Sequence, residues 1–297
     1  MKPANSSGLT RCPEKNSGSQ NLKSRPQRWR GACAGLSLAV LALCATSASA
    51  QNWIEANLGT TTLAGSVTTN GDGSLTIVGG GDDIWGTTSS CKYYYAWASG
   101  TNWDVTCQVQ SFSGPDAWSK VELMVDNADT TAGPQGNDAF IAVMGTQPTG
   151  QNAGVNQFGN DQMRTVRNGS ADWVQVGTTP TPQYPNAWMR ITRTNSVFRC
   201  FYSYDGVTWT NYVNLDTANT GSLGGGSTTT FAGAWPNLVC VGIAVTAHNN
   251  GDPGGATATI AHLTSNFSGH YGTYRRQHDG SGLEYHDPRR KRSILLL

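Results

Sequence analysis

The stretch AWMRITRTNSVFRCFYSYDGVTWTNY, from Ala187 to Tyr212, predicts the fold because it contains three short β segments joined by two tight turns. Asn195 lies in the first turn, and Asp205-Gly206, a dipeptide that favours the positive φ angles of a hairpin, forms the second. Between the turns, bulky residues occupy both sets of alternating positions, which is typical of a strand packed on one face and partly covered on the other. We expect a structural hairpin in which Trp209 folds over the Asp205 loop.

The same pattern continues through the rest of the chain body. Short segments rich in β-forming residues are separated by clusters of Gly, Asn, Asp and Ser, and no long segment carries the apolar stripe of a helix. This favours an all-β sandwich or barrel of antiparallel strands. A propeller is not expected, because the stretch from Ser203 to Trp209 that resembles an Asp-box occurs only once. Further strands are expected at 74–78, 91–97, 103–112, 121–125, 139–144, 157–166, 173–176, 237–246 and 257–263.

Residues 1–50 have the features of a secretory signal peptide with a long basic n-region. An apolar run from Ala32 to Cys44 is followed by Ala48-Ser49-Ala50, the small residues that signal peptidase accepts, before Gln51. The run is too short to span a membrane, so no transmembrane segment is expected in the mature chain. The sequence thus predicts a secreted, periplasmic or cell-surface protein, and the long n-region leaves open a true start codon downstream of Met1.

Residues 51–267 form one predicted domain, large enough to bury a single core. They hold 7 Lys and Arg residues against 15 Asp and Glu residues, a formal charge of −8. A domain of this charge repels a phosphate backbone, so nucleic acid is not an expected partner. Residues 268–297 are basic and have almost no β pattern, which predicts a disordered tail; a surface-binding tail and a shifted reading frame are the alternatives.

Four cysteines remain after the predicted cleavage site, an even number that suits an oxidising compartment. Cys91 and Cys107 flank the turn 98–101 almost symmetrically, so we expect them to pair, which leaves Cys200 with Cys240. Four free buried thiols are the alternative.

Five motifs occur together in an order that is similar to one superfamily of secreted domains. They resemble the concanavalin A-like lectin/glucanase superfamily, particularly its regulation-of-enolase-like group. The resemblance covers 53–267 and implies a jelly-roll sandwich of two antiparallel sheets, but no particular reaction. The motifs are GDDIWG (81–86), SKVELMVDN (119–127), AWMRITR (187–193), YSYDGVTW (202–209) and VGIAVTAHNNG (241–251).

A glycosidase needs two carboxyl groups about 5–9.5 Å apart. Laminarinase-type members of the superfamily carry acids at alternate positions of one strand, whereas here Met124 follows Glu122 on the same face. Glu122 and Asp126 share that face, but four residues at about 3.3 Å each separate their backbones by about 13 Å. The sequence therefore favours a non-catalytic protein over an enzyme, and no catalytic residue is assigned.

Aromatic residues point instead to a binding surface, because sugar C–H faces stack on rings while polar groups bond the hydroxyls. The alternative is that most of these rings build the core between the sheets. The candidate ligand-binding residues are Tyr93, Tyr95 and Trp97 on one strand face, Trp103 and Trp118 beside loops, and Asn249 and Asp252 in a strand-end loop.

Calcium is the one candidate cofactor, with oxygen ligands from Asp82 and Asp83; solvated turn acids are the alternative. The resulting prediction is a secreted, non-catalytic module that binds an extracellular carbohydrate or another cell-surface polymer. A glycoside hydrolase acting on extracellular polysaccharide and a structural or adhesive envelope module are the alternatives.

Overall fold

The computed structural model describes residues 51–147, 158–175, 181–219, 230–269, 273–276 and 283–286, and every helix or strand assigned in these ranges is a β-strand. The all-β prediction is therefore confirmed for the described part of the chain. The predicted signal peptide lies outside it. Within the same ranges no helix is long and apolar enough to cross a membrane.

One antiparallel sheet has eight strands, in the order β1-β4-β13-β6-β7-β8-β9, with β15 also paired to β4. Its strands are β1 (Ile54–Leu58), β4 (Cys91–Ser99), β6 (Lys120–Asp126), β7 (Phe140–Thr146), β8 (Phe158–Arg164), β9 (Asp172–Gln175), β13 (Leu238–Thr246) and β15 (Ser268–Gly269).

The other antiparallel sheet has seven strands, in the order β12-β11-β10-β5-β14-β3-β2. These are β2 (Ser66–Thr69), β3 (Leu75–Gly79), β5 (Asn102–Ser113), β10 (Ala187–Thr194), β11 (Val197–Ser203), β12 (Thr210–Asp216) and β14 (Ala256–Ser265).

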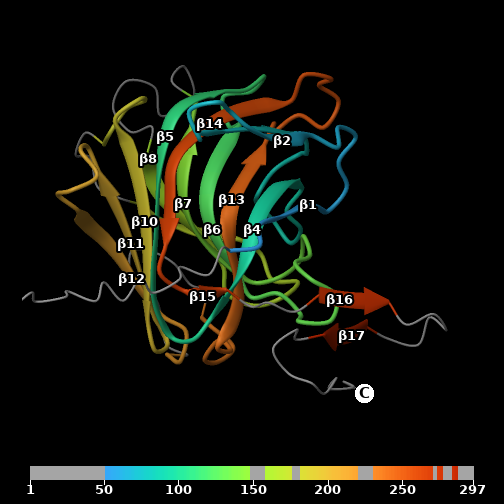
Figure 1. Ribbon diagram of the computed structural model, residues 1–297, viewed down its shortest axis with the longest axis vertical. Helices are drawn as coiled ribbons and strands as arrows, with labels where there is room; N and C mark the ends of the chain where they lie inside the picture. The colour runs from blue at the N-terminus through green and yellow to red at the C-terminus, as the bar shows by residue number, and fades with distance from the viewer. Residues whose placement is uncertain are drawn as a thin grey trace, which may run out of the picture. The chain divides into compact units, whose positions relative to one another are not determined.

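The chain crosses repeatedly between the two sheets, as Figure 1 shows. Strands β3, β4, β5 and β6 alternate between them, and so do β12, β13 and β14. Two facing antiparallel sheets with such crossings form a jelly-roll sandwich, which confirms the predicted fold class.

The hairpin predicted between Ala187 and Tyr212 is present as β10, β11 and β12. Asn195 has φ 56° and Gly206 has φ 73°, as tight turns require. Asp205 Oδ1 accepts hydrogen bonds from the backbone N–H groups of Val207 and Thr208 at 2.8 and 2.7 Å, and these bonds lower the pKa of Asp205 to about 2. The Trp188 ring packs against this turn, since a Cβ at Gly206 would lie 2.9 Å from its atoms.

Apolar side chains at alternate positions of both sheets meet between them. Leu123 and Ile243 are fully buried here, so this layer is the main core. Its other members include Val105, Cys107, Val109, Val121, Val125, Met189, Ile191, Cys200, Val239, Val241 and Val245.

The face of the eight-stranded sheet that is turned away from the other sheet, called here the outer face, is also buried. Every residue of β6 and β7 is buried, which requires cover on both sides of these strands. A second apolar cluster lies on the outer face and includes Leu58, Ile84, Tyr93, Tyr95, Trp97, Met124, Phe140 and Cys240.

The predicted disulfides are wrong, since all four cysteines are free and buried. Cys107 and Cys200 belong to the core between the sheets, whereas Cys91 and Cys240 belong to the cluster on the outer face. The eight-stranded sheet therefore lies between the two side chains of each predicted pair, which disfavours the close approach that a disulfide needs.

The predicted tail is not irregular throughout. Ser268–Gly269 pairs with β4, and β16 (Thr273–Arg276) pairs with β17 (Leu283–His286). The Tyr and Thr residues of the last two strands favour β structure. The other residues of 270–297 lie outside the described part.

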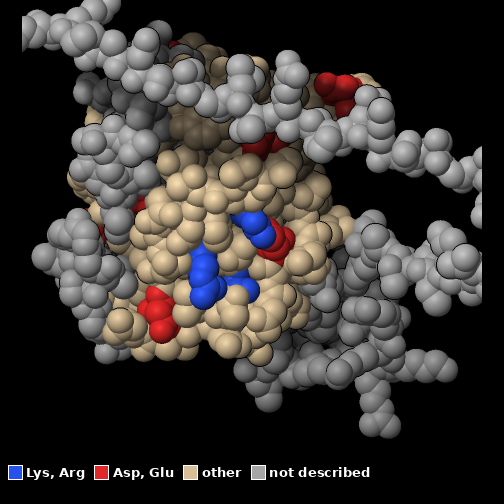
Figure 2. All heavy atoms as spheres, turned by 90° about the vertical axis from the view of Figure 1, so that its left-hand side faces the viewer, with Lys and Arg blue, Asp and Glu red and all other residues tan. Residues whose placement is uncertain are grey.

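The side of the molecule that carries β10, β11 and β12 has few charged side chains, as Figure 2 shows. Arg190 pairs there with Asp104, and its guanidinium lies 5.3 Å from the ring centres of both Phe201 and Trp209. Among the described residues, this side thus offers no broad charged patch.

Candidate functional site

Two loops form the cover of the outer face: residues 80–90 between β3 and β4, and residues 127–139 between β6 and β7. Arg164 of β8, only 1% exposed, joins them. Its guanidinium donates to the carbonyls of Gly136 and Asp138 at 2.8 and 2.9 Å, to the Gly86 carbonyl at 3.1 Å and to Ser89 Oγ at 3.1 Å. Burial lowers the pKa of Arg164, and these acceptors satisfy a charged group that is costly to bury alone.

Two glycines allow the cover to pack closely against β1. The Ser89 N–H donates to the Gly136 carbonyl at 2.6 Å. A Cβ at Gly136 would lie 2.3 Å from the Ser89 carbonyl oxygen, and a Cβ at Gly59, which has φ 61°, would meet that same oxygen at 2.3 Å. Only residues without a side chain fit at these two positions.

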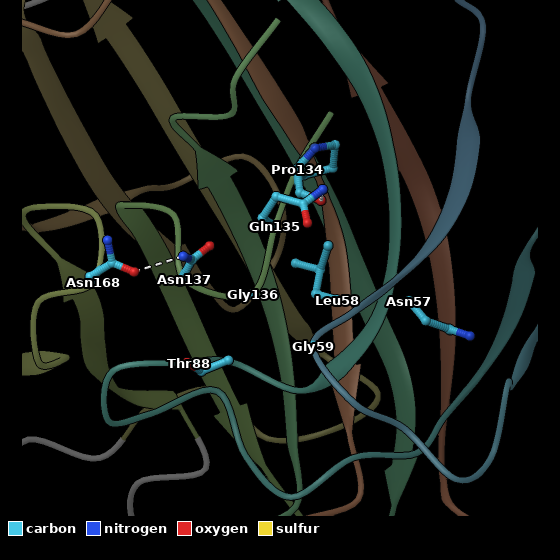
Figure 3. Close-up of a pocket in the computed structure, with 9 residues that line it drawn as sticks. All are labelled: Asn57, Leu58, Gly59, Thr88, Pro134, Gln135, Gly136, Asn137 and Asn168. Atoms are coloured by element: carbon cyan, nitrogen blue, oxygen red, sulfur yellow. Dashed lines mark hydrogen bonds between the residues drawn. The ribbon is translucent and has the colours of Figure 1, made fainter. Parts of the chain in front are cut away.

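A pocket of about 340 Å³ opens where these segments meet (Figure 3). Asn137 Nδ2 donates to Asn168 Oδ1 at 2.7 Å, and the Asn168 N–H donates to the Asn137 carbonyl at 2.8 Å, so the two amides are fixed relative to each other. Carboxamides both donate and accept hydrogen bonds, which suits a neutral ligand rich in hydroxyl groups. The lining residues are Asn57, Leu58, Gly59, Thr88, Pro134, Gln135, Gly136, Asn137 and Asn168, none of which titrates near neutral pH.

A chain of charged groups lies at the start of β6. Asp83 pairs with Lys120 and lies 3.2 Å from His248 Nε2, while Asp116 lies 3.0 Å from His248 Nδ1. These contacts tie together the loops that carry Asp83, Asp116 and His248.

The two acids of the outer face are not accessible to solvent. Glu122 is 0% exposed and Asp126 is 2% exposed. Burial raises the pKa of Glu122 to about 8, opposed by nearby Lys120, and burial raises the pKa of Asp126 well above its ordinary value. As placed, neither carboxyl can reach a substrate.

The structure puts Tyr93, Tyr95 and Trp97 in one row on the outer face, with ring centres 5.1 and 6.4 Å apart. The cover leaves them 0%, 6% and 7% exposed, so they do not form an open platform. Trp103, at 3%, belongs to the core between the sheets. These four rings build packed layers, which corrects the expectation that they are available to a ligand.

The remaining predicted residues lie beside the charged chain rather than in the pocket. Trp118 is 37% exposed, and its backbone N–H donates to Asp116 Oδ1 at 2.7 Å. Asn249 and Asp252 accept backbone N–H groups of their own loop, from Gly251 at 3.2 Å and Gly254 at 2.8 Å. Their side-chain oxygens therefore stabilise turns.

The expected calcium ligands lie in the cover. Asp83 already contacts Lys120 and His248, which leaves Asp82 as the exposed carboxylate of the two. In the described ranges, no group of three or more His, Cys, Asp or Glu side chains is placed to hold a metal ion.

Sequence reasoning missed the residues that build the pocket. Asn57, Gln135, Asn137 and Asn168 come from separate segments with no shared spacing. One signal in the sequence was Arg164, because it lies within an expected strand. If such a cation is buried, it must be surrounded by several hydrogen-bond acceptors from other segments.

No protein-family model and no curated protein matches this sequence. Solved structures with a similar fold include a functionally unknown protein from Saccharomyces cerevisiae (16% identity, 73% of this chain and 96% of that chain covered, TM-score 0.46). Others are the carbohydrate-binding module CBM66 from Bacillus subtilis (10%, 71% and 94%, TM-score 0.40) and a glycoside hydrolase family protein from Mycobacterium thermorestibile (14%, 72% and 92%, TM-score 0.42).

Proposed function

We propose that this protein is an exported, non-catalytic module that binds a neutral carbohydrate through the pocket between β1 and the cover. The observation that carries the proposal is the pocket lining, in which a threonine and the carboxamides of Gln135, Asn137 and Asn168 lie around a cavity of about 340 Å³ without a titratable group, while the Asn57 side chain points away from them (Figure 3). Such a lining matches sugar hydroxyls by hydrogen bonding and offers no acid or base for bond cleavage.

Three further features support this proposal. The signal-peptide pattern of residues 1–50 would bring the domain to extracellular glycans. The acids of the outer face are buried. The motif resemblance to the regulation-of-enolase-like group is compatible with binding, since the concanavalin A-like superfamily contains binding modules as well as enzymes.

A glycan array followed by calorimetry on the full chain tests the proposal. We expect Asn137→Ala and Asn168→Ala each to weaken binding by at least tenfold, because each removes an amide from the pocket and releases the other. Asn214→Ala is the matched control, since Asn214 is an exposed residue of β12 in the other sheet. Absence of binding to every glycan, or unchanged binding in both pocket variants, would contradict the proposal.

The same preparations distinguish the two alternatives. Release of reducing ends from a polysaccharide, abolished in Glu122→Gln, would favour a glycoside hydrolase. Capture of an envelope protein without any affinity for saccharides would favour an adhesive module.

A further inference from the structure

Two tryptophans in the chain segments that supply Thr88 and Asn168 to the pocket are partly exposed. Trp85 is 36% exposed and Trp173 is 39% exposed, whereas most large apolar residues of the described chain are buried. An indole gains free energy when an apolar surface covers it, so exposed indoles beside a polar pocket are candidates for ligand contact.

Both tryptophans belong to the segments that build the pocket. Trp85 precedes Gly86 in the loop that supplies Thr88, and Trp173 follows the turn that supplies Asn168. The Ala171 N–H donates to the Gly86 carbonyl at 2.7 Å, which joins the two segments directly.

The strand register places Trp173 on the same face as the cover. Trp173 lies opposite Gln162, two residues from Arg164, and side chains at alternate positions of a strand share a face. Arg164 Nη2 in turn donates to the Trp85 carbonyl at 3.2 Å. The backbone of Trp85 is therefore held by Arg164, and that of Trp173 by its pairing with β8.

We infer that the natural ligand is an extended glycan chain, of which one unit occupies the pocket while adjacent units lay their C–H faces on Trp85 and Trp173. This inference rests on the proposed function and specifies its ligand class. The amides of the pocket select hydroxyl groups, and the indoles add apolar contact area that a single sugar cannot reach. Affinity then increases with chain length.

Chain-length dependence provides the test. The probes are glucose and mannose, each compared by calorimetry with the corresponding hexamers: cellohexaose, laminarihexaose and mannohexaose. For at least one series, we expect the wild-type full chain to bind the hexamer at least tenfold more tightly than the monomer. Trp85→Ala and Trp173→Ala should reduce this ratio to within about twofold while leaving monomer affinity unchanged, and Trp173→Phe should retain most of it because a ring remains.

Trp118→Ala is the matched control, because Trp118 is 37% exposed but belongs to the loop that contacts His248. Thermal melts establish that each variant is folded. An unchanged length ratio in both tryptophan variants, combined with loss of binding in Asn168→Ala, overturns the extended-chain inference and leaves the pocket function intact. Equal binding of monomer and hexamer by the wild type, or binding of neither, also overturns it.

Discussion

The two faces of the eight-stranded sheet are both buried, but different parts of the chain bury them. The inner face packs on the second sheet through aliphatic side chains such as Leu123 and Ile243. The outer face is closed by loops, with aromatic rings, two carboxyl groups and the Arg164 guanidinium beneath them. The difference separates the frame from the proposed site: strand pairing and aliphatic packing build the frame, while the loop-covered face builds the pocket.

The strongest test of this contrast uses neighbouring residues of β6. Leu123→Ala should lower the free energy of unfolding by about 2–5 kcal/mol, because the cavity lies between two sheets that cannot close around it. Met124 is the next residue of β6, and it is only 1% exposed on the outer face. Met124→Ala should lower the free energy of unfolding by about 1 kcal/mol less than Leu123→Ala does, because loops relax around a cavity more easily than sheets. Urea denaturation measures both, and equal or reversed costs would remove the distinction between the faces.

A smaller effect on stability, but a larger one on local order, is expected at Arg164. Arg164→Met should cost about 1–3 kcal/mol, because the cover carbonyls lose their donor until water replaces it. Hydrogen exchange should accelerate at the amides of Ser89 and Asn168, which donate to carbonyls of the cover at Gly136 and Asn137.

Arg167→Met is the control for this experiment, since Arg167 lies in the adjacent turn and pairs with Asp138 through a side chain that is 46% exposed. If both variants exchange alike, Arg164 does not hold the cover.

The smallest expected effect is a change in the pH dependence of stability. The pKa of Glu122 is about 8 in the folded state, against an ordinary value of 4.5. Between these values the unfolded chain has lost this proton and the folded chain retains it, so the free energy of unfolding decreases as pH rises through that window. Glu122→Gln removes this contribution and should reduce the loss of stability between pH 5 and pH 8, by on the order of 1 kcal/mol or more. An identical slope in wild type and variant would mean that Glu122 is ionised in the folded protein.

The frame was predictable because its signals are local. Asp205-Gly206 marked a turn, and alternation marked β10 and β11. The burial of β6 and β7 on both faces also had a signal, since the runs VELMV and AFIAVM are apolar without alternation. The prediction of exposed rings failed because alternation separates the two faces of a strand without showing which loops cover one of them. The predicted Cys91–Cys107 disulfide failed because β4 and β5, although joined by a short turn, belong to different sheets. The pocket depends on contacts among Gly59, Ser89 and Gly136, which no spacing in the sequence records.

The four sulfhydryl groups downstream of Gln51 have a practical consequence. Each is enclosed by side chains, and burial raises the pKa of Cys107 to about 12 and those of Cys91, Cys200 and Cys240 well above their ordinary value. Almost no reactive thiolate then exists at neutral pH. A chain starting at Gln51 can be produced in a reducing cytoplasm, and a single engineered cysteine at Thr88 would take a maleimide dye selectively, giving a fluorescent reporter at the pocket rim.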